Sequence, residues 1–129
     1  MTIHADRPKI LIVEDNGSIV GFINEILTNE GYCIIDMVAT GREAIEIARD
    51  TRPDLILMDI SLRGEMDGIT AYERIKETAG IPVVYVSAYN DEHIIARAIK
   101  SHPGGYLVKP FMIEQLIKSV GDALAWSRP

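Results

Sequence analysis

Short runs of consecutive apolar residues alternate along this chain with segments in which apolar residues recur every three or four positions. Continuous apolar runs are typical of strands buried on both faces, and the three-to-four spacing is typical of amphipathic helices. Their alternation predicts repeated strand–helix–strand units around a parallel sheet. Five such units fit the chain, with predicted strands at residues 9–13, 32–37, 54–58, 82–86 and 105–108.

Each predicted strand is followed by a segment with one apolar helical face. Gly31 and Pro53 are expected to end the first and second helices, and the third should end near Gly80. Asp91 has the position and chemistry of an N-terminal cap for the fourth helix. The last helix is predicted at residues 113–126, and the pattern as a whole predicts a single domain over residues 1–129 with a core at about 8–126.

The composition changes this picture only by excluding some functions. There are 13 Lys and Arg residues against 19 Asp and Glu residues, a formal charge of -6. That balance repels phosphate backbones and anionic membrane surfaces, so we expect no direct contact with nucleic acid. The apolar runs are too short to span a membrane and the first residues lack a signal-peptide core, which favours a cytoplasmic protein without membrane insertion.

Cysteine and histidine offer little candidate chemistry. A lone Cys33 cannot form an intrachain disulfide, and its apolar neighbours predict a buried, unreactive side chain. His4, His93 and His102 have no metal-binding spacing, and we expect them to be solvated.

Polar residues follow the predicted strands in a pattern. Glu14 and Asp15 follow the first strand, Asp59 the third, Ser87 the fourth and Lys109 the fifth. Each alone is commonly a helix cap, a strand end or a solvated charge. Ligands of open α/β sheets bind beyond the carboxyl ends of the strands, where these groups would converge. Three converging carboxylates call for a cation, and hard oxygen ligands suit Mg²⁺.

Four segments together resemble a known family: ILIVEDN at 10–16, DLILMD at 54–59, VVYVSA at 83–88 and GYLVKPF at 105–111. They are similar to the receiver domain of two-component response regulators, and the similarity spans roughly residues 8–126. The resemblance implies a flavodoxin-like (βα)5 fold, a doubly wound five-stranded parallel sheet of order 2-1-3-4-5. It also implies a signalling protein, not a separate enzyme, that takes a phosphoryl group from a histidine kinase or phosphotransfer protein.

The resemblance assigns roles to individual residues. It implies that Asp59 is the phosphoacceptor, that Lys109 and Ser87 contact phosphoryl oxygens, and that Mg²⁺ is the cofactor. The implied metal ligands are Asp15 directly, Glu14 through water, Asp59, and the backbone carbonyl of Ser61.

A switch is also implied, in which the Ser87 hydroxyl moves toward the phosphoryl group and Tyr106 turns inward. The alternative for Tyr106 is a fixed, half-buried strand tyrosine. The switched face would be the fourth helix, fifth strand and fifth helix, which we expect to bind a downstream output protein or domain, or to form a homodimer.

Several positions depart from the commonest family pattern. The loop ISLRGEMDG at 60–68 is one residue longer than usual, with Arg63 where many members have proline. Ser87 replaces the more frequent threonine, and Tyr89 is either a screen against hydrolysis or a surface aromatic. The Lys109–Pro110 bond resembles a cis peptide of the family.

Two alternative functions share part of this pattern. A metal-dependent phosphatase using an aspartyl phosphate would have an acidic residue two positions after the nucleophile, where this chain has Ser61. A receiver-like module without phosphorylation would lack one of the acidic residues, the Asp or the Lys, and none is missing.

Overall fold

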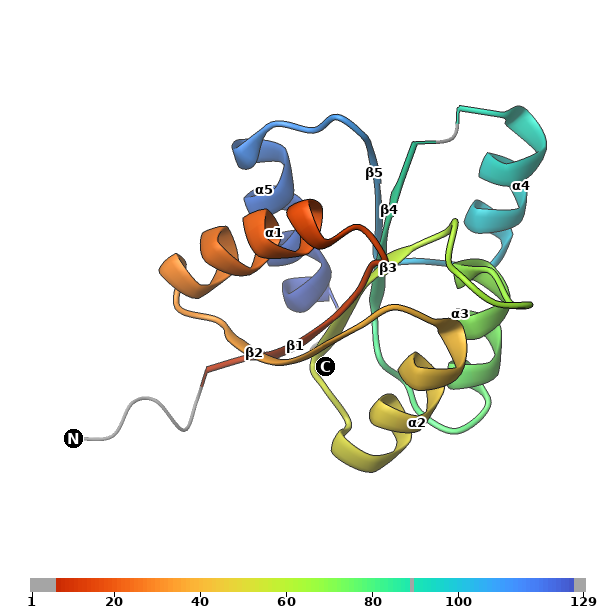
Figure 1. The fold of residues 1–129 in the computed structure, drawn as a ribbon, viewed down its shortest axis with the longest axis horizontal. Coiled ribbons are helices and arrows are strands. Elements are labelled where there is room, and N and C mark those ends of the chain that lie inside the picture. Colours follow the sequence, from red (N-terminus) through yellow and green to blue (C-terminus); the bar gives the residue numbers. More distant parts are fainter. Residues whose placement is uncertain (1–6, 89, 127–129) are drawn as a thin grey trace.

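A computed structural model describes residues 7–88 and 90–126 of the chain. In that part of the chain, five parallel strands form one sheet of order β2-β1-β3-β4-β5 (Figure 1). The strands are β1 (Lys9–Val13), β2 (Cys33–Val38), β3 (Leu55–Asp59), β4 (Val83–Ser87) and β5 (Gly105–Val108). The helices are α1 (Gly17–Asn29), α2 (Gly41–Thr51), α3 (Gly68–Lys76), α4 (Glu92–Lys100) and α5 (Ile113–Trp126). The predicted fold class and strand order are confirmed.

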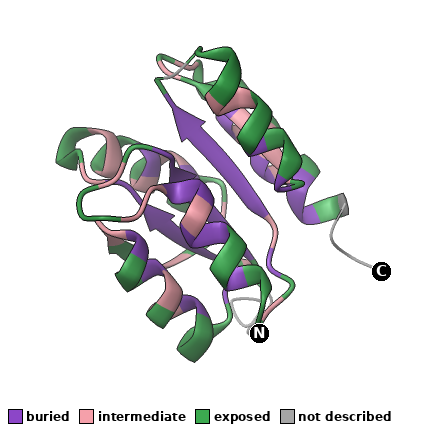
Figure 2. Cartoon of the chain, turned by 90° about the vertical axis from the view of Figure 1, so that its right-hand side faces the viewer, coloured by how far each residue is buried: buried purple, intermediate pink, exposed green. Residues whose placement is uncertain are grey.

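The sheet lies between two layers of helices. Helices α1 and α5 cover one face, and α2, α3 and α4 cover the other (Figure 1). Alternate strand residues face opposite layers, so Ile10 and Ile12 pack with α1 and α5 while Leu11 and Val13 pack with the other helices. Strands β3 and β4 are buried at every residue, which explains their continuous apolar sequence (Figure 2).

Local sequence signals determine where the helices begin and end. Asp91 caps α4 as predicted, accepting hydrogen bonds from the backbone N–H groups of His93 and Ile94. Gly31, with φ of 94°, follows the end of α1, where a left-handed conformation suits glycine. Helix α3 ends at Lys76, earlier than Gly80, and a turn follows in which the backbone N–H groups of Thr78 and Ala79 both donate to the carbonyl of Ile75.

The prediction of a buried Cys33 is wrong. Cys33 is exposed, and none of the residues 33–38 is fully buried. The physical reason is that β2 lies at the edge of the sheet, where the helical layers cover a strand incompletely. Apolar neighbours in sequence therefore did not indicate burial on this strand.

Within residues 7–88 and 90–126, we find no helix with both the length and the apolar character needed to cross a membrane.

Candidate functional site

The predicted site residues stand at one edge of the sheet. Asp59 and Ser87 are the last residues of β3 and β4, Glu14 and Asp15 directly follow β1, and Lys109 directly follows β5. Because these four strands are parallel neighbours, their carboxyl ends meet at the same edge. The backbone N–H of Lys109 donates to the carbonyl of Ser87 (2.8 Å), which joins the ends of β4 and β5.

Three carboxylates converge at this edge. One oxygen from each of Glu14, Asp15 and Asp59 lies within 4.8 Å of the other two. Glu14 and Asp59 are only 5% and 4% exposed, whereas Asp15 is partly exposed. The ammonium of Lys109 donates to Oε1 of Glu14 (2.8 Å) and to Oδ2 of Asp59 (3.4 Å). The lysine, which follows the edge strand β5, therefore links the ends of β1 and β3.

The position of Asp59 is determined by close backbone packing around it. The backbone N–H of Ser61 donates to its Oδ1 (3.1 Å). Gly68 begins α3 directly against the strand, and a Cβ there would collide with the backbone carbonyl of Asp59 and the side chain of Met58. Only glycine allows α3 to start this close to the end of β3.

The electrostatics of the site shift Asp59 toward its neutral form when no metal is bound. Burial, followed by the charge of Glu14, raises the pKa of Asp59 to about 7, and Lys109 opposes this only in part. Burial lowers the pKa of Lys109, but its hydrogen bond to Glu14 and the charge of Asp59 outweigh burial and raise it above its ordinary value. The site thus has more negative charge than its lysine neutralises.

A second cation lies at the mouth of the cluster. Nε of Arg63 is 3.8 Å from Oδ2 of Asp15, and the arginine side chain is 74% exposed. Arg63 departs from the commonest family pattern, and its pairing with Asp15 was not predicted from the sequence. The unusual length of this loop and the arginine at position 63 were the sequence signals that could have pointed to it.

Ser87 and Tyr106, the predicted switch residues, lie on the neighbouring strands β4 and β5. Ser87 is fully buried at the end of β4. Tyr106 is half-buried, and its ring meets the ring of Tyr85 edge-on with centroids 6.2 Å apart.

Comparison with known proteins decides the family. The sequence model of the Response regulator receiver domain matches residues 10–121. The chain belongs to this family. The transcriptional regulatory protein PdtaR of Mycobacterium tuberculosis is 36% identical over 117 residues, which cover 91% of this chain and 57% of PdtaR. The chain spans about half the length of the curated relatives it matches.

Solved receiver domains share the fold over nearly their whole length. The signal receiver domain of a modulated diguanylate cyclase from Desulfovibrio desulfuricans superimposes with a TM-score of 0.88 at 32% identity, covering 95% of this chain and 97% of that one. The N-terminal domain of a response regulator/sensory box/GGDEF protein from Carboxydothermus hydrogenoformans gives a TM-score of 0.83 at 34% identity, covering 92% and 94%.

The residues of this receiver domain fit the divalent cation that its family binds. Glu14, Asp15 and Asp59 offer hard oxygen donors from a compact cluster, and two of the three are almost wholly buried. Buried carboxylates with one ammonium between them carry uncompensated charge that a divalent ion would balance. The fit therefore rests on the donor set and its burial.

Other expectations for the receiver domain have mixed outcomes. The Lys109–Pro110 peptide is cis, as the resemblance implied. His93 and His102 are exposed as predicted. Tyr89 and His4 lie outside the residues that the structure describes, so the interpretations of both stay predictions.

Proposed function

We propose that this receiver domain is a phosphorylation switch in which Asp59 accepts a phosphoryl group from the phosphohistidine of a histidine kinase or phosphotransfer protein. The observation that supports it most directly is the bridge of Lys109 between Glu14 and Asp59 inside a three-carboxylate cluster. An inert interaction module would gain nothing from burying these charges, which cost free energy unless something binds them.

In the proposed reaction, an oxygen of Asp59 attacks phosphorus and the phosphorus–nitrogen bond of the donor breaks. The bonding electron pair leaves with the imidazole, which takes up a proton. Asp59 must be ionised to attack, and its raised pKa of about 7 keeps it partly protonated near neutral pH without a cation. Glu14, Asp15, Asp59 and the Ser61 carbonyl would hold Mg²⁺, which supplies charge neutralisation for the phosphoryl oxygens.

Lys109 has a separate role in this proposal. Its ammonium already lies 3.4 Å from Oδ2 of Asp59, so it can transfer a hydrogen bond to a phosphoryl oxygen with little movement. The hydroxyl of Ser87, at the end of the next strand, donates to another phosphoryl oxygen. Both groups would stabilise the added charge of roughly −1.5 to −2.

The partner-binding face is proposed to be α4, β5 and α5. Ile99 and Val108 on these elements are 62% and 47% exposed, which is unusual for large apolar side chains and suits a contact with an output domain or a second copy. The proposal also assigns the domain to the cytoplasm, where ATP-dependent kinases make the phosphohistidine donor.

The test is phosphorylation by acetyl phosphate, followed by intact-mass spectrometry. We expect one phosphoryl group per chain with Mg²⁺, none with excess chelator, and none in Asp59→Asn with Mg²⁺. Modification that persists in Asp59→Asn would show that another residue is the acceptor.

A further inference from the structure

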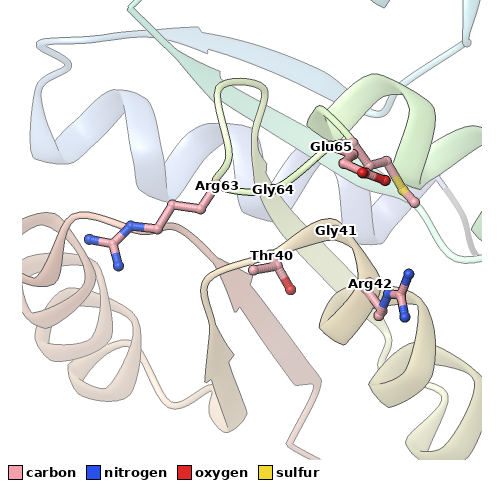
Figure 3. A pocket seen from close by; sticks show the side chains of 7 residues that line it. Thr40, Gly41, Arg42, Arg63, Gly64 and Glu65 are labelled. Atoms are coloured by element: carbon pink, nitrogen blue, oxygen red, sulfur yellow. The ribbon is translucent and has the colours of Figure 1, made fainter.

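Two arginines line one hollow beside the acidic cluster, but they differ in their relation to it. The hollow, of about 350 Å³, lies between the start of α2 and the loop after β3, and its lining includes Arg42 and Arg63. Figure 3 shows the two side chains pointing in opposite directions from the hollow. Only Arg63 makes a described ion pair with a carboxylate of the cluster, at 3.8 Å from Asp15.

The backbone holds Arg63 in this position. Residues 40 and 63 form an isolated parallel bridge, which fixes the loop against the turn before α2. The next residue, Gly64, has φ of 94°, a left-handed conformation that lets the chain turn away after residue 63. The arginine is therefore presented to the site by an anchored loop, although its guanidinium is largely in solvent.

The two cationic side chains of the site contact different carboxylates. Lys109 contacts Glu14 and Asp59, while Arg63 contacts Asp15, the most exposed member of the cluster. Asp15 is also the carboxylate that an incoming cation would meet first from solvent. A divalent ion bound to Asp15 must share the carboxylate with the guanidinium of Arg63 or displace it. When both cations contact the same carboxylate, they lie close enough to repel each other.

We propose that Arg63 acts as a tethered counterion of Asp15 and thereby lowers the affinity of the acidic site for divalent cations. The inference rests on the proposed function, since it takes the cluster to be the metal site. An exposed ion pair contributes little and is screened by salt, so the effect should be about two- to five-fold in affinity at low ionic strength.

The experiment measures Mg²⁺ binding directly by isothermal titration calorimetry, with no phosphodonor present. We expect Arg63→Gln to bind Mg²⁺ about two- to five-fold more tightly than the parent, and Arg63→Lys to stay near the parent. Arg42→Gln is the matched control, because it removes the same charge from the same hollow without touching Asp15. The gain in Mg²⁺ affinity of Arg63→Gln should shrink at about 0.5 M KCl, because salt at that concentration screens charge interactions over distances of a few ångströms.

Each outcome has a defined meaning. If Arg63→Gln and the parent bind Mg²⁺ with equal affinity, the inference is overturned. It is also overturned if Arg42→Gln gains as much Mg²⁺ affinity as Arg63→Gln, because the effect would then come from net charge and not from the contact with Asp15. The absence of Mg²⁺ binding to all of these proteins would overturn the inference as well. If Arg63→Gln binds Mg²⁺ more tightly but acetyl phosphate leaves Asp59 unmodified, the inference holds and the proposed phosphorylation fails.

Discussion

Asp59 is a carboxylate that the fold holds in an unfavourable environment. It is 4% exposed, it shares its surroundings with Glu14, and burial and that neighbour raise its pKa from 3.8 to about 7. Between these two pH values the unfolded chain carries a charge that the folded chain does not, so folding takes up a proton. The contribution of Asp59 to stability is therefore fully present below about pH 4 and is lost as the pH rises to about 7.

This environment predicts that Asp59→Asn stabilises the metal-free protein at neutral pH. Asparagine keeps the shape but carries no charge, so the free energy of unfolding should rise by on the order of 1–3 kcal/mol above pH 7. The gain should shrink as the pH falls and approach zero at about pH 3 and below, where the aspartate is protonated in both states. Urea unfolding at several pH values, in the presence of chelator, measures it.

Magnesium provides the control for that prediction. Mg²⁺ is expected to bind and stabilise the folded parent. Adding the ion should therefore reduce the difference in free energy of unfolding between the parent and Asp59→Asn at about pH 7.5. A variant that is less stable than the parent at neutral pH without metal would contradict the electrostatic account of Asp59.

At the scale of secondary-structure elements, the apolar runs predicted which segments are strands because β1, β3 and β4 are almost wholly buried. The same reasoning failed for Cys33, since the edge position of β2 depends on strand order and is not visible in the strand's own sequence. The candidate site residues were predictable because functional side chains of open α/β sheets lie at the carboxyl ends of the strands. The pairing of Arg63 with Asp15 was not, because it depends on the path of a loop.

Helix α4 is held mainly at its C-terminal end. Of residues 92–100, Ala98 alone is fully buried. Just beyond the helix, the hydroxyls of Tyr85 and Ser101 share a buried hydrogen bond (2.7 Å), and the ammonium of Lys76 donates to the Ser101 carbonyl (2.6 Å). Along the helix, Arg97 donates to Asp67 (3.0 Å). These contacts anchor one end of a lightly packed helix.

We predict that Tyr85→Phe loosens α4. The variant loses one buried hydrogen bond, which should cost about 1 kcal/mol of stability and speed amide hydrogen exchange in residues 92–101. Hydrogen–deuterium exchange with mass spectrometry measures the effect. Tyr72→Phe is the control, because its hydroxyl lies 3.4 Å from the His102 carbonyl and contributes a weaker bond. Equal exchange in Tyr85→Phe and the parent would refute the anchor.

At the scale of the whole molecule, three tyrosine rings connect the sheet to the helical layer. Tyr106 meets Tyr85 edge-on, and Tyr85 meets Tyr72 edge-on with centroids 6.0 Å apart. The chain of rings runs from β5 through β4 to α3. A movement of Tyr106 would therefore change the packing of the ring whose hydroxyl anchors α4.

The switch hypothesis predicts that beryllofluoride, a mimic of the phosphoryl group, shifts the NMR signals of the Tyr106 ring and of α4. In Ser87→Ala these shifts should be much smaller, although beryllofluoride still occupies Asp59. The physical reason is that the Ser87 hydroxyl is the group proposed to move toward the phosphoryl oxygens. Identical Tyr106 and α4 signals in the parent, with Asp59 occupied, would establish a fixed tyrosine.

The strands that supply the site are far apart along the chain. Glu14 follows β1, Asp59 ends β3, and Lys109 follows β5, yet Lys109 touches both carboxylates. A chain still emerging from the ribosome contains Asp59, the proposed acceptor, long before it contains Lys109. The bridge of Lys109 to both carboxylates cannot form until β5 has joined the sheet. Under the proposed function, a nascent chain would therefore become competent to accept a phosphoryl group only after β5 has joined the sheet, and a chain that has not reached this point would draw no phosphoryl groups from the donor.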